Sequence, residues 1–158
     1  MTDLHFALKL IHILGATVLF GTGLGIAFFM LMAHRTRDAA FIARTAGTVV
    51  VADALFTASA VIVQPLSGAA LMHVVGYGWS DSWVVASLAL YVLTGVFWIP
   101  VVFIQMRLRD LAAAAARDNA ELPPRYHRLF RLWFVLGWPA FIVVLCILAL
   151  MIAKLRLW

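Results

Sequence analysis

The sequence contains few charged residues and almost no cysteine. Only 12% of its 158 residues are Asp, Glu, Lys or Arg, whereas a typical soluble domain has about 25%. The single cysteine, Cys146, has no disulfide partner and no C-x-x-C-H context for covalent haem, so we expect it to be a packing residue. The chain also lacks a nucleotide-binding P-loop, a dinucleotide glycine fingerprint and a metalloprotease histidine pair. These absences argue against an ordinary soluble enzyme of those classes.

Hydrophobic residues make up 65% of the chain and are gathered in four long runs, each long enough to cross a bilayer. The third run is expected to continue as a helix through an alanine-rich segment, and Pro123 and Pro124 are expected to end that extension. The sequence therefore predicts an all-α fold, a polytopic membrane four-helix bundle that forms a single transmembrane domain over residues 1–158. The expected helices span about 7–33, 47–73, 83–117 and 124–155.

The basic residues predict the orientation of these helices. Nine of the 12 Lys and Arg residues fall in the connections between helices one and two and between helices three and four, and the other three lie near the termini. The positive-inside rule then places both connections in the cytoplasm and both termini outside. No cleaved signal peptide is evident. We expect a multi-pass protein of a bacterial inner membrane whose net charge of +5 attracts anionic membrane lipids rather than nucleic acid. A homo-oligomer is also a candidate assembly.

Two histidines, His12 and His73, lie near the outer ends of the first two runs. The predicted topology puts them at similar depth on neighbouring helices, where they could clamp one haem iron from both faces. Gly15 and Ala16 share the face of His12 and leave room for a flat macrocycle. Small residues also serve close helix packing, and a histidine near a helix end can hydrogen-bond at the interface, so the residues alone leave both readings open.

Further polar groups lie elsewhere in the apolar runs or at their cytoplasmic ends. His34 and His127 could ligate a second haem near the inner surface, and Arg131 could bind a propionate or simply follow the positive-inside rule. Asp53 is expected to pair with a cytoplasmic arginine, to be protonated, or to relay a proton. Gln64, beside Pro65, is expected to satisfy freed backbone or to point into a cavity.

The stretches "LKLIHILGATVLF" and "FFMLMAHR" resemble the first helix of the HemJ-type protoporphyrinogen IX oxidases, which are four-helix bacterial membrane proteins that bind haem b. By this resemblance His12, three residues after Lys9, is the haem ligand, and His34 is the second histidine of the helix. The start and end of the fourth run are similar too. The whole chain also resembles a bacterial family of predicted integral membrane proteins of unknown function.

The residues and the resemblance together predict a haem b-binding membrane protein. Its expected role is electron transfer or the oxidation of a small lipophilic substrate, such as a quinone or a porphyrin-like molecule, which would make it a haem-dependent oxidoreductase. One alternative is a small-solute or ion transporter or channel, with Asp53 and Gln64 lining the pathway. The other is a non-catalytic membrane subunit or assembly factor, in which the glycine-rich helix packs against a partner.

Overall fold

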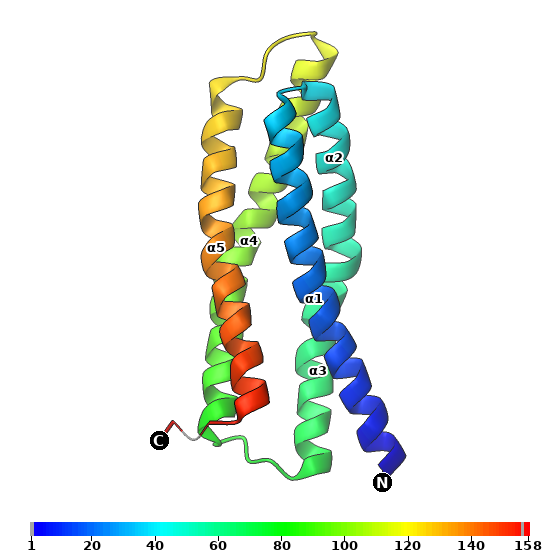
Figure 1. Cartoon of the computed structure of the whole chain (residues 1–158), viewed down its shortest axis with the longest axis vertical. Coiled ribbons are helices and arrows are strands. Elements are labelled where there is room, and N and C mark those ends of the chain that lie inside the picture. The colour runs from blue at the N-terminus through cyan, green and yellow to red at the C-terminus, as the bar shows by residue number, and fades with distance from the viewer. Residues whose placement is uncertain (1, 156) are drawn as a thin grey trace.

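The chain folds as a bundle of long helices in a computed structural model that describes residues 2–155 and 157–158 (Figure 1). The described residues contain no β-strand, and four helices are long and apolar enough to cross a membrane. The all-α, four-span prediction is therefore confirmed. The elements in chain order are α1 (Thr2–Thr36), α2 (Ala39–Ala52), the π-helical segment η1 (Asp53–Thr57), α3 (Ala58–Val75), α4 (Ser82–Arg117) and α5 (Pro124–Ala153).

The second span begins earlier than the apolar pattern indicates. Asp38 accepts hydrogen bonds from the backbone N–H groups of Ala40 (2.8 Å) and Phe41 (3.0 Å), and so caps α2 eight residues before the expected start at 47. An Asp at the N-cap satisfies backbone donors that have no helical partner. The span then runs through α2, η1 and α3 without a break and ends at Gly76, whose φ of 82° suits a residue without a side chain.

Both connections that carry most of the arginines lie at one end of the bundle, and both chain termini lie at the other (Figure 1). α1 packs along α2, η1 and α3, while α4 packs on α5 and, near the connections, on α2. Toward the termini the α1–α3 pair diverges from the α4–α5 pair (Figure 1). The helices thus alternate in direction, as the basic connections predict.

The main buried core occupies the half of the bundle near the connections. It is formed by Ile26, Met30, Ala33, Ile42, Ala46, Val49, Leu108, Ala112, Tyr126, Phe130 and Trp133. Small residues on α2 and α4 let these helices approach closely, which is how membrane helices gain packing energy without a hydrophobic effect between them. The half near the termini holds only a small cluster of Met72, Trp83 and Val84.

Large apolar side chains face outward on every span. Leu66 is 67% exposed, Val92 65% and Val135 62%. In water such continuous exposure would be unstable, whereas lipid solvates it. The exposed faces therefore fit an integral membrane protein.

Candidate functional site

His12 meets α3 through a hydrogen bond that fixes the orientation of its ring. Its Nδ1 lies 2.8 Å from Oγ of Ser67, which is buried in the α1–α3 contact. The hydroxyl of Ser67 lies 2.6 Å from the carbonyl oxygen of Val63 and 3.2 Å from that of Gln64. A carbonyl can only accept, so the single hydroxyl hydrogen points at these oxygens and Ser67 Oγ accepts from the imidazole.

This arrangement assigns the tautomer of His12. With the hydrogen on Nδ1, the neutral ring keeps its lone pair on Nε2, which makes no hydrogen bond within the described residues. A histidine that donates from one ring nitrogen to an orienting group and offers the other to a metal is the usual arrangement at metal sites. Nothing in the sequence indicated that Ser67 orients His12, because this contact depends on the register between α1 and α3.

The small residues beside His12 serve the contact between α1 and α3. The side-chain amide of Gln64 donates to the carbonyl oxygen of His12 at 2.8 Å. A Cβ added at Gly15 would lie 2.6 Å from Gln64 Nε2, and one added at Gly68 would lie 3.3 Å from His12 Cε1. Gly15 therefore makes room for a side chain of α3. Ala16, its neighbour in the predicted cradle, is half-buried.

The structure does not bring His73 to His12. His73 lies six residues beyond Ser67, which is about 9 Å along the axis and about 120° around the helix. Its side chain is exposed, as is that of Lys9. The two histidines were expected at similar depth, but the antiparallel register places His12 beside Ser67 and Gly68 instead. Assignment of His73 as a second ligand finds no geometric support within one chain.

Asp53 is buried at the start of η1, with 6% of its surface exposed. The side chains of Thr57 and Trp98 approach its carboxyl group. The Thr57 hydroxyl is buried and makes no hydrogen bond within the described residues. The one ion pair among the described residues joins Arg109 and Asp110, so the expected pairing of Asp53 with an arginine is not found there. A buried carboxylate on a π-helical segment remains a candidate site, since such segments are frequent at functional positions.

Tyr91, which the sequence analysis did not identify, supplies the hydrogen bond that Pro65 removes from α3. Pro65 has no N–H for the carbonyl of Val61, one turn earlier. The Tyr91 hydroxyl of α4 donates to that carbonyl and ties α3 to α4. Gln64, the expected partner for freed backbone, binds α1 instead. A tyrosine inside an apolar run needs a partner for its hydroxyl, and this signal was present in the sequence.

His34, His127 and Arg131 come together where α1 ends and α5 begins. The His34 ring stacks on Phe130 with centroids 3.7 Å apart and lies 5.9 Å from the ring of His127. Nδ1 of His34 lies 3.4 Å from the Tyr126 hydroxyl. Arg131 and His34 share the lining of a groove of about 320 Å³. Ligation of a second haem here stays a prediction.

No set of three or more His, Cys, Asp or Glu side chains in the described part of the chain is arranged to hold a metal ion. A haem site needs only one or two protein ligands, so the separate histidines are considered individually. Among them, His12 has the shorter orienting contact, 2.8 Å from Nδ1 to Ser67 Oγ against 3.4 Å from His34 Nδ1 to the Tyr126 hydroxyl. It also lies deeper inside its span than His34, which is two residues from the end of α1.

Comparison with known proteins gives a family and no activity. No curated protein matches the chain, and no solved structure does. A family model described as a predicted integral membrane protein, DUF2269, matches residues 6–155, a range that holds every candidate residue named above. The chain therefore belongs to this family of predicted integral membrane proteins.

Proposed function

We propose that this integral membrane protein binds haem b and that His12 is an axial ligand of the iron. The observation that carries the proposal is the hydrogen bond between His12 Nδ1 and Ser67 Oγ at 2.8 Å. Because Ser67 directs its own hydrogen at backbone carbonyls, His12 presents an unprotonated Nε2. Neutral imidazole with a fixed ring is the donor that haem iron takes in b-type sites.

The residues around His12 fit this role in three ways. Ser67 orients the ring, and the Gln64 amide holds the backbone of α1 at the same turn. The site lies in a membrane-spanning helix, where an apolar surround favours a lipophilic macrocycle. When bound, haem would supply one-electron chemistry, either electron transfer or oxidation of a small lipophilic substrate such as a quinone or porphyrin-like molecule.

The visible spectrum of the protein purified in detergent from haem-replete cells tests the proposal. We expect a Soret band in the wild type and its loss in His12→Ala. Ser67→Ala should keep the band but lower haem affinity, since loss of a group that orients a metal ligand typically costs about 10–100-fold. His34→Ala is the matched control on the same helix and should keep the band at His12.

A colourless wild type would refute the proposal. A coloured protein that loses its band in His34→Ala but not in His12→Ala would move the site to the cytoplasmic end of α1. Equal haem affinity in Ser67→Ala and the wild type would show that the hydrogen bond has no part in ligand orientation.

One observation favours a second candidate, a small-solute or ion transporter. Asp53 and Thr57 are 6% and 5% exposed on a π-helical segment inside a span, without a cationic partner in the described residues. Ionisable groups in this position often line transport pathways. Colourless protein whose reconstituted vesicles show an ion flux that Asp53→Asn abolishes would replace the haem proposal.

A further inference from the structure

A groove opens between the cytoplasmic ends of α1 and α5. It has a volume of about 320 Å³ and is lined by Leu31, His34, Phe130, Arg131, Phe134 and Val135. Four of these side chains are apolar hydrocarbon or aromatic groups, and the two polar ones are a guanidinium and an imidazole, which both donate hydrogen bonds. Both polar side chains lie near the arginine-rich connections, because His34 is two residues from the end of α1 and Arg131 is about two turns after the start of α5.

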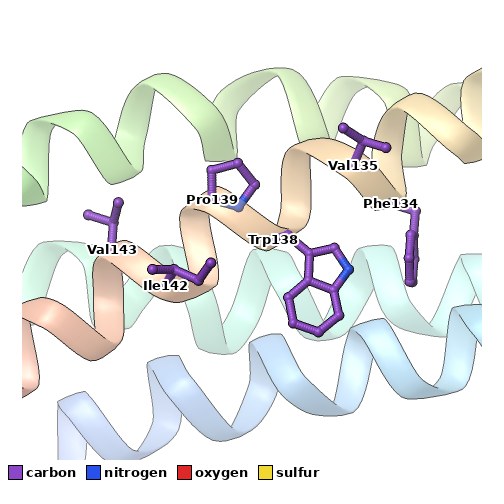
Figure 2. Close-up of a pocket in the computed structure, with 6 residues that line it drawn as sticks. All are labelled: Phe134, Val135, Trp138, Pro139, Ile142 and Val143. Carbon is purple, nitrogen blue, oxygen red and sulfur yellow. The ribbon is translucent and has the colours of Figure 1, made fainter.

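The groove continues along α5 into the membrane. A second hollow of about 560 Å³ is lined by α5 alone and shares Phe134 and Val135 with the first (Figure 2). Figure 2 shows its walls, with Trp138 and Phe134 on one side and Pro139 on the other. From Arg131 to Val143 the path covers twelve residues, about 18 Å of helix. One leaflet of the hydrocarbon core is about 15 Å thick. The residues that line the two hollows therefore extend along α5 over about the depth of one leaflet.

The head of the groove carries unmatched positive charge. Arg131 is exposed, and the described residues contain one ion pair, which involves Arg109 and Asp110 instead. The His34 ring is held in place by its stacking on Phe130 at 3.7 Å. An exposed guanidinium near the start of a span, with no carboxylate partner in the described residues, is suited to a phosphate.

We propose that this groove is a binding site for one phospholipid with an anionic headgroup. The phosphate meets Arg131 and His34, and one acyl chain follows α5 past Val135 and Trp138 toward Val143. The site is independent of the haem proposal, since His12 and His34 are 22 residues apart on one helix, about 33 Å. A quinone is the rival occupant, but its neutral head has no need of an unpaired arginine.

Native mass spectrometry of the full chain in detergent tests the site with phosphatidylglycerol and phosphatidylcholine as probes. We expect tighter binding of phosphatidylglycerol. Arg131→Gln should lower that affinity about tenfold, the effect of losing one charge-assisted contact. Arg128→Gln is the matched control, because Arg128 is exposed about one turn before Arg131 on α5 but does not line the groove. This variant should change the affinity for phosphatidylglycerol less than about twofold.

A second pair of variants tests the path of the acyl chain. Val135→Phe fills the groove from an exposed position and should weaken binding of both lipids, whereas Leu132→Phe, exposed but outside both hollows, should not. Equal binding of the two lipids by the wild type, or equal effects of Arg131→Gln and Arg128→Gln, would overturn the proposal. Displacement of phosphatidylglycerol by a quinone that binds equally well to Arg131→Gln would assign the groove to the quinone instead.

Discussion

Gly15→Ala tests the contact between α1 and α3 that orients His12. The added Cβ would lie 2.6 Å from Gln64 Nε2, so the amide must move and its hydrogen bond to the His12 carbonyl must break. An interhelical hydrogen bond in a membrane protein contributes about 0.6 kcal/mol on average and up to about 1.7 kcal/mol. Alanine gains up to about 1 kcal/mol over glycine in helix propensity. We therefore expect the free energy of unfolding of Gly15→Ala to stay near that of the wild type.

Gly23→Ala is the control for this gain. Gly23 lies on the same helix, and a Cβ there would meet nothing within 4 Å. Gly23→Ala should gain helix propensity without losing a hydrogen bond. Its free energy of unfolding should therefore exceed that of Gly15→Ala by about 0.6–1.7 kcal/mol. In a chain that also carries Gln64→Ala, Gly15→Ala and Gly23→Ala should have the same free energy of unfolding. Unfolding in mixed micelles, followed by tryptophan fluorescence, gives these free energies. Equal gains with Gln64 present would refute the packing role of Gly15.

Three further predictions concern the hydrogen bond from Tyr91 beside Pro65, the cation of Lys154 and the orientation of the helices in the membrane. Tyr91→Phe leaves a backbone carbonyl unpaired and should cost about 1 kcal/mol of unfolding free energy; in a Pro65→Ala background, which restores the helix N–H, it should cost almost nothing. Lys154→Met removes a cation 4.4 Å from one aromatic ring and should cost about 0.5–1 kcal/mol, measured by the same unfolding assay. In a chain without its native cysteine, Ser80→Cys should react with an impermeant maleimide on intact cells. Asn119→Cys should react only after permeabilisation, and the reverse pattern would invert the topology.

The sequence predicted the number of spans because four apolar runs separated by arginine-rich or glycine-rich connections have no soluble alternative. It misplaced the start of α2 because the apolar pattern begins after the helix does. The capping carboxylate of Asp38 sets that start, and Asp38 is a local signal that hydropathy does not register. The clustering of His34, His127 and Arg131 followed from topology alone, since the end of α1 and the start of α5 lie at the same end of the bundle.

The details of the His12 site could not be obtained from the sequence. Topology places two antiparallel helices side by side but does not fix their register to within one turn. About 1.7 turns separate Ser67, which hydrogen-bonds to His12, from His73, which was expected to lie at similar depth to His12. The glycines near His12 were open to two interpretations, and the 2.6 Å approach of Gln64 to a Cβ at Gly15 assigns that residue to helix packing.

The most direct test of the central claim is the haem content of the purified protein. We predict about one haem b per wild-type chain, extracted by acid–acetone and quantified against protein mass, and almost none in His12→Ala folded to the same helical content. The absence of haem from the wild type, or an undiminished content in His12→Ala, would contradict the account.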